Sequence, residues 1–163
     1  MLPFSASSRL PLFVTLQKGG GLRGCIGTLS PQPLSVLRDY VHSSAFHDRR
    51  FEALKEDELK SGIDLSVSLL VAYEDVAYCL DWVVGTHGII IKTEIDSVRY
   101  SATFLPEVAT EQGWTTEETV HSLLRKAGFT GPVTADVLQA ISTTRYQSSK
   151  FKLSYADYLV ARS

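Results

Sequence analysis

The sequence has few cysteines, and neither stands in a metal-binding spacing. Among 163 residues there are two, Cys25 and Cys79, with no C-x-x-C pair and no His pair nearby. The sequence therefore predicts neither a zinc site nor a disulfide framework, and we expect no metal and no cofactor. Lone thiols are typical of reducing compartments, so we expect a cytoplasmic and/or nuclear protein.

Long hydrophobic runs and an excess of charge are also missing. No apolar run approaches the roughly 18 residues of a membrane-spanning helix, so we expect no membrane association. Lys and Arg number 16 against 18 Asp and Glu, a net charge of −2, which does not favour nucleic acid as a partner. A hydrophobic content of 44% with 21% charged residues is typical of an ordinary globular domain.

Two kinds of hydrophobic periodicity define the expected elements. Alternation and β-branched runs predict strands at 12–17, 22–27, 63–69, 89–91, 98–104 and 144–147. Three- and four-residue spacing predicts helices at 33–46, 115–127 and 133–141, and residues 154–159 fit a strand or a short helix. Leu105-Pro106-Glu107 is interpreted as closing the second hairpin. Strands in hairpins favour an α+β fold with a mainly antiparallel sheet flanked by helices.

The segment Leu22-Arg23-Gly24-Cys25-Ile26-Gly27 concentrates unusual residue types. Glycines inside a strand mark a bulge or a place where another backbone or a ligand approaches closely. Arg23 could bind an anion or face solvent, and Cys25 could be a reactive thiol or a small buried hydrophobic residue. The segment is therefore a candidate site with a structural alternative.

Partners for this segment must come from elsewhere in the chain. The turn Gly85-Thr86-His87-Gly88 holds a His on flexible backbone, where its ring could activate a thiol or the turn could be an ordinary surface loop. Arg50, beside Arg49 and Phe51, could form an anion-binding corner. Glu107 is by default a surface charge, and we keep it as a ligand-binding candidate.

Several segments together resemble the AMMECR domain family in its eukaryotic form. The hallmark is Leu22–Gly27, and Ala45-Phe46-His47-Asp48-Arg49-Arg50-Phe51 resembles the family's Ala-x-x-Asp-x-Arg-Phe segment. Gly85–Ile89 resembles its Gly-x-His-Gly turn, and Phe104–Ala109 its Leu-Pro segment. The similarity covers residues 11–162 as one domain. Residues 1–10 do not resemble the family's N-terminal helix, so we expect an extension or a truncated start there.

The resemblance implies an antiparallel sheet flanked by helices, a smaller subdomain, and a cleft that the hallmark segment faces, with both termini in the larger subdomain. No activity is settled for the family. Its prokaryotic members are often encoded with Memo-type and radical S-adenosylmethionine proteins, which the resemblance suggests as partners in a shared chemistry.

Three functions compete on these residues. In the first, the chain is a regulatory module that binds a small anionic ligand or a protein partner through Arg23, Gly24, Gly27, Arg50 and Glu107. In the second, it is an enzyme with Cys25 as nucleophile and His87 as general base. In the third, basic and aromatic residues near the end of the chain contact nucleic acid: Arg145, Tyr146, Lys150, Phe151 and Lys152. Binding is the function we favour, and whether the chain is catalytic stays open.

Overall fold

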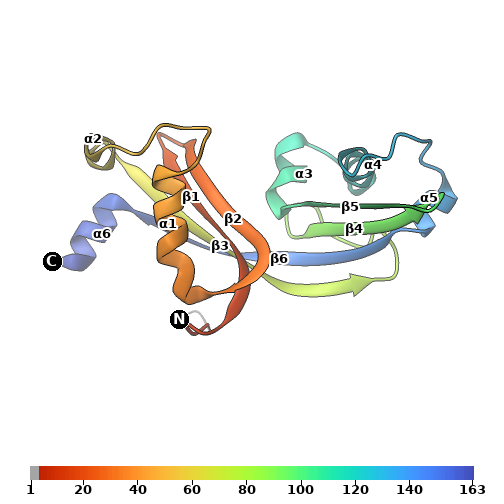
Figure 1. Cartoon of the computed structure of the whole chain (residues 1–163), viewed down its shortest axis with the longest axis horizontal. Helices are drawn as coiled ribbons and strands as arrows, with labels where there is room; N and C mark the ends of the chain where they lie inside the picture. Colours follow the sequence, from red (N-terminus) through yellow and green to blue (C-terminus); the bar gives the residue numbers. More distant parts are fainter. Residues whose placement is uncertain (1–3) are drawn as a thin grey trace. The chain divides into compact units, whose positions relative to one another are not determined.

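Six strands and their connecting helices make up the computed structural model, which describes residues 4–163 (Figure 1). The strands are β1 (Arg9–Lys18), β2 (Gly21–Pro33), β3 (Ile63–Val76), β4 (Gly88–Ile95), β5 (Val98–Phe104) and β6 (Ser142–Ser154). The helices are the 3₁₀ turn η1 (Leu34–Val36), α1 (Leu37–Phe46), α2 (Glu56–Lys60), α3 (Pro106–Gln112), α4 (Thr116–Lys126), α5 (Ala135–Gln139) and α6 (Tyr155–Arg162). The first three of residues 1–10, the expected extension, lie outside the described residues.

The strands are hydrogen-bonded in the order β2-β1-β3-β6-β4-β5. The pairs β1–β2, β1–β3, β4–β5 and β4–β6 are antiparallel. The predicted α+β class with an antiparallel sheet and flanking helices is therefore confirmed. None of the helices in the described part of the chain has the length and apolar character needed to cross a bilayer.

Contacts divide the chain into two compact units, one of residues 1–70 with 149–163 and the other of residues 71–148. We call them the terminal unit and the middle unit. In the terminal unit, α1 packs on the hairpin of β1 and β2 (Figure 1). The core beneath α1 contains Leu16, Ala45 and Ile63, with Leu54, Leu59 and Leu65 packed against them.

The middle unit has its own core between the hairpin of β4 and β5 and the helices α3 and α4, which lie on the same side of that hairpin (Figure 1). Its fully buried side chains come from both layers and from the loop between β3 and β4: Cys79, Ile91, Val120, Leu123 and Leu124. Each unit thus buries a separate hydrophobic cluster, as a helix stripe and a sheet face require.

The segment after β5 differs from the prediction. Leu105-Pro106-Glu107 does not merely close the hairpin, because Pro106 is the first residue of α3. Proline suits this position, since the helix needs no hydrogen bond from its nitrogen there. Gly113 ends α3 in the left-handed conformation, with φ of 69°, a typical helix C-terminal signal. At the end of the chain, the helical alternative is the observed one, as α6.

Helix α4, predicted over residues 115–127, begins with a capping box formed by Thr115 and Glu118. Thr115 Oγ1 accepts a hydrogen bond from the amide of Glu118 at 3.2 Å, and the Glu118 carboxylate accepts one from the amide of Thr115 at 2.8 Å. These two bonds satisfy amides that the helix itself cannot pair.

Thr115→Ala should lower the free energy of unfolding by about 1 kcal/mol, because it removes the side-chain acceptor of this cap. Urea denaturation would measure the change. Thr116→Ala is the matched control, since no side-chain hydrogen bond of Thr116 occurs among residues 4–163, and it should change stability little. Equal effects of the two substitutions would contradict the role given to the cap.

Candidate functional site

The two sequence segments Leu22–Gly27 and Ala45–Phe51 meet at the backbone of Cys25. Strand β2 is an edge strand, so the peptide groups on its outer side lack a partner strand. Asp48 Oδ2 accepts the Cys25 amide at 2.9 Å, and Arg50 Nη2 donates to the Cys25 carbonyl at 3.2 Å. The side chains of an acidic and a basic residue thus both hydrogen-bond to the backbone of Cys25 in the edge strand.

Asp48 and Arg50 form a closely hydrogen-bonded ion pair. Arg50 donates to the Asp48 carboxylate through Nε at 3.0 Å, through Nη2 at 2.7 Å and through its backbone amide at 3.1 Å. The Arg50 side-chain bonds, with the amides of Cys25 and Arg50, hold the pKa of Asp48 well below its usual range, although burial opposes this. The pair also raises the pKa of Arg50.

Arg23 makes a bidentate pair of the kind expected for it, but its carboxylate belongs to the same chain. Nε and Nη2 donate to the two oxygens of Glu58, each at 2.9 Å, and Nη2 also donates to the Glu52 carbonyl at 2.9 Å. The hydrogen bonds from Arg23 lower the pKa of Glu58. The same hydrogen bonds raise the pKa of Arg23. The Arg23 side chain is only 13% exposed, so its fork is already largely occupied.

The Phe51 ring lies close to both arginines. The guanidinium carbon of Arg23 is 5.9 Å from the centre of the Phe51 ring, and that of Arg50 is 5.5 Å from it. Both distances fall within the range of cation–π attraction. The ring therefore joins the Arg23–Glu58 and Arg50–Asp48 pairs into one cluster, which we call the arginine cluster: Arg23, Asp48, Arg50, Phe51 and Glu58.

The two glycines of the hallmark segment allow close approach of other parts of the chain. A Cβ at Gly24 would overlap the carbonyl of Ser44 in α1, and a Cβ at Gly27 would overlap the Phe13 ring and the Leu12 carbonyl in β1. Helix packing therefore explains Gly24, and strand packing explains Gly27, without a ligand. Contact of either glycine with a ligand stays a prediction.

The thiol of Cys25 is half-buried and accepts a hydrogen bond from Thr15 Oγ1, with 3.2 Å between oxygen and sulfur. Cys79 differs, because its side chain is fully buried in the middle unit and this burial raises its pKa. Access therefore distinguishes the two thiols.

Iodoacetamide should modify Cys25 in the native protein much faster than Cys79, because only the former reaches solvent. Peptide mass spectrometry after timed quenching would give both rates. In urea, where both thiols are exposed, the rates should converge, which provides the control. Equal protection of the two thiols in the native protein would contradict the exposure of Cys25.

The other predicted site residues belong to the middle unit. His87 is buried, and its Nδ1 accepts the amide of Val83 at 3.0 Å, which closes the turn. Gly88 lies against the buried ring of Tyr146, where a Cβ would overlap that ring. Glu107 is exposed in the first turn of α3. No hydrogen bond within residues 4–163 joins His87 or Glu107 to the arginine cluster, so their roles stay predictions.

The nucleic-acid hypothesis loses part of its local support. Arg145 pairs with Glu74 at 3.0 Å and Asp81 at 3.3 Å, and Lys152 pairs with Asp64 at 2.8 Å. Tyr146 is fully buried, so its ring cannot stack on a base. The charges that suggested a basic strand are therefore largely neutralised by the chain itself.

Comparison with known proteins identifies the family of this chain. The model of one protein family, AMMECR1, matches residues 3–151, which include both segments of the arginine cluster. The chain belongs to the AMMECR1 family.

Relatives of this AMMECR1-family chain include an uncharacterised protein of Arabidopsis thaliana, 49% identical over 157 residues, which cover 91% of this chain and 73% of that protein. An uncharacterised protein of Schizosaccharomyces pombe is 43% identical over 155 residues, 92% of this chain and 78% of the relative. These matches confirm the resemblance to eukaryotic members. A crystal structure of an uncharacterised Pyrococcus horikoshii protein superposes with a TM-score of 0.67 at 28% identity, over 90% of this chain and 75% of the other.

Sequence reasoning did not select two acids of this AMMECR1 site. Asp48 stands inside a family segment, but only its position beside Cys25 reveals its role. Glu58 carries no local signal, because it lies 35 residues from Arg23. Within residues 4–163, no three His, Cys, Asp or Glu side chains gather as a metal ion would require.

Proposed function

We propose that this AMMECR1-family chain is a regulatory binding module, and that Arg50 with Phe51 and the adjoining Leu22–Gly27 segment contacts a small anion or an acidic segment of a protein partner. The observation that carries the proposal is that the Arg50 side chain is held in place and yet exposed. Its guanidinium is fixed by the buried Asp48, yet 57% of the side chain is exposed. Nη1 makes no hydrogen bond among the described residues, so its two donors are available to a ligand.

Fixed donors favour binding, because little side-chain freedom is lost when a ligand arrives. Each of the two remaining donors on Nη1 can form a charge-assisted hydrogen bond with an oxygen of a carboxylate or phosphate. Beside the Arg50 guanidinium lies the half-buried Cys25, whose carbonyl Arg50 binds. In the same segment Leu22 is 46% exposed.

The proposal also concerns where this surface lies in the fold and where the protein acts in the cell. We propose that it faces the cleft expected for the family, and that it acts in the cytoplasm or nucleus, for which the two free cysteines are the support. Memo-type and radical S-adenosylmethionine proteins are the first partners to test. The enzyme alternative has less support, because the side-chain contact of the Cys25 thiol is a hydroxyl, Thr15, and not a base.

NMR titration tests the proposal, with inorganic phosphate and a tetraglutamate peptide as the two probes. We expect saturable shifts at the amides of Cys25, Arg50 and Phe51. Arg50→Ala should weaken binding about tenfold or more, because a charge-assisted hydrogen bond is lost. Arg49→Ala is the matched control, since Arg49 is exposed and makes no side-chain hydrogen bond among residues 4–163. Equal affinity of the two variants, or no saturable shift with either probe, would refute the proposal.

A further inference from the structure

The outer edge of β2 carries hydrogen bonds that a neighbouring strand would normally make. β2 is the outermost strand of the order found within residues 4–163, so no strand lies beyond it there. Even so, the Cys25 amide donates to Asp48 Oδ2 at 2.9 Å, and the Cys25 carbonyl accepts from Arg50 Nη2 at 3.2 Å. Both lengths are usual for hydrogen bonds of an N–H group. Cys25 is therefore paired on its outer side.

The arrangement matches what an antiparallel strand would supply. In a hydrogen-bonded pair of an antiparallel ladder, one residue exchanges both its N–H and its C=O bond with a single residue opposite. At Cys25 the Asp48 carboxylate takes the place of the opposite carbonyl, and the Arg50 guanidinium takes the place of the opposite amide. Two side chains thus substitute for one residue of a strand. We call Asp48 and Arg50 the edge cover.

We propose that the edge cover prevents the outer edge of β2 from pairing with the β2 edge of a second copy of this chain. An edge strand with free peptide groups is a template for pairing with another chain. A second copy is the partner that the edge cover must exclude, because it presents the same edge at the same residue, and two identical edges can pair about a twofold axis. Such pairing at Cys25 requires that Asp48 and Arg50 leave first.

A β-bulge beside Cys25 is a second obstacle to strand pairing. Leu16 of β1 lies opposite Gly24, and the next residue, Gln17, lies opposite Leu22. Arg23 is therefore the extra residue of a bulge in β2. A bulge bends the strand and interrupts its regular spacing, and natural sheets use bulges, charged side chains and covering loops to protect their edges. All three occur on this stretch of β2, which supports the proposed role of the edge cover.

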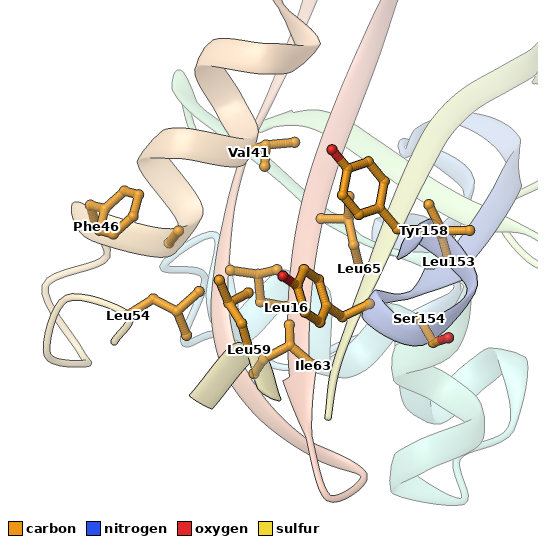
Figure 2. Close-up of a pocket in the computed structure, with 12 residues that line it drawn as sticks. Leu16, Val41, Phe46, Leu54, Leu59, Ile63, Leu65, Leu153, Ser154 and Tyr158 are labelled. Atoms are coloured by element: carbon orange, nitrogen blue, oxygen red, sulfur yellow. The ribbon is translucent and has the colours of Figure 1, made fainter. Parts of the chain in front are cut away.

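The part of the chain that carries the edge cover is itself fixed to the terminal unit. Between α1 and α2 the chain passes beside the β1–β2 hairpin (Figure 1), where the Glu52 carbonyl and the Glu58 carboxylate accept hydrogen bonds from Arg23. Leu54 and Leu59 pack against the core of the terminal unit and line an apolar pocket between α1 and α6 (Figure 2). Polar and apolar contacts together hold the edge cover against β2.

The inference does not depend on the anion binding proposed above. The edge cover uses Nε and Nη2 of Arg50, whereas Nη1 is the atom assigned to the ligand. A ligand at Nη1 leaves both hydrogen bonds to Cys25 in place. The two roles of Arg50 can therefore be tested separately.

Sedimentation velocity of the full chain over a range of concentrations, with a reductant present, tests the proposal. Asp48→Ala/Arg50→Ala removes both members of the ion pair, so neither charge is left without its partner. We expect this double variant to dimerise with a dissociation constant at least about tenfold below that of the native chain. Arg49→Ala/Asp57→Ala is the matched control, because it removes the same two charges from exposed residues that make no side-chain hydrogen bond within residues 4–163. It should sediment as the native chain does.

A second variant keeps the test independent of how well the double variant folds. The Arg50 side chain is 57% exposed, so Arg50→Ala should keep the fold. It frees the Cys25 carbonyl alone and should dimerise more weakly than the double variant and more tightly than the native chain. Hydrogen exchange by NMR locates the contact, because the Cys25 amide of the double variant should exchange fast in the monomer and slowly in the dimer.

Two results would overturn the proposal. In the first, the folded variants sediment as the native chain does at every concentration, so that an uncovered edge does not associate. In the second, a dimer forms but the Cys25 amide exchanges as fast in it as in the monomer, which would place the contact on another surface.

Discussion

Gly24→Ala should destabilise the protein by about 3 kcal/mol. The added Cβ would overlap the backbone carbonyl of Ser44, and the backbone of the packed helix α1 cannot move as a side chain can. The Ser44 side chain also holds this helix in place, because its hydroxyl donates to the Val14 carbonyl and accepts a hydrogen bond from the Ile26 amide. Helix α1 would have to move away from the sheet.

Urea denaturation of Gly24→Ala would measure this loss, with Gly21→Ala as the control. Gly21 lies in the same strand, and a Cβ there would meet its nearest neighbour, the Lys18 carbonyl, at an ordinary 3.6 Å. Neither glycine has a positive φ, so the two substitutions differ mainly in space. If Gly24→Ala were as stable as Gly21→Ala, close packing of α1 on β2 would be refuted.

Local signals in the sequence were sufficient for much of the fold. The capping pair Thr115 and Glu118, and the alternation from Ile63 to Leu69, predict a helix start and a strand that both occur. These features depend on residues close together in the chain, where spacing alone fixes geometry. Helix α3 was missed because its start and end signals, Pro106 and Gly113, enclose only seven residues.

The candidate site depends on contacts that spacing cannot predict. The sequence indicated that something approaches Gly24 closely, but that it is Ser44 depends on how α1 packs. An anion partner for Arg23 was also expected, and Glu58 of the same chain fills that place. Residue types therefore predicted the kind of contact, and only the fold identified the partner.

The apolar pocket between α1 and α6 in the terminal unit is the feature that the sequence predicts least. Its base is formed by Leu16 and Leu65, and part of one wall by Tyr158 (Figure 2). Each of these residues is unremarkable in its own segment, since apolar side chains are what a core requires. A cavity is a shortfall in packing between segments, so no pattern within one segment can reveal it.

Asp48→Asn should lower the free energy of unfolding at pH 7 by about 2–3 kcal/mol, because a buried carboxylate that accepts four hydrogen bonds is replaced by an amide with one acceptor. The amides of Cys25 and Arg50 then compete for that acceptor, and the new NH₂ group faces the Arg50 guanidinium. Asp57→Asn is the control, since Asp57 is exposed in α2 and makes no side-chain hydrogen bond among residues 4–163.

The pH dependence of this loss identifies its cause. Because folding lowers the pKa of Asp48, the stability that its charge supplies is complete above the unfolded pKa of about 3.9 and declines as pH falls toward the folded value. The native chain should therefore lose its advantage over Asp48→Asn as the pH is lowered from about 5 to 2. Urea denaturation at several pH values would measure the difference. A difference that does not change with pH would mean that shape, and not the ion pair with Arg50, is what Asp48 contributes at the edge of β2.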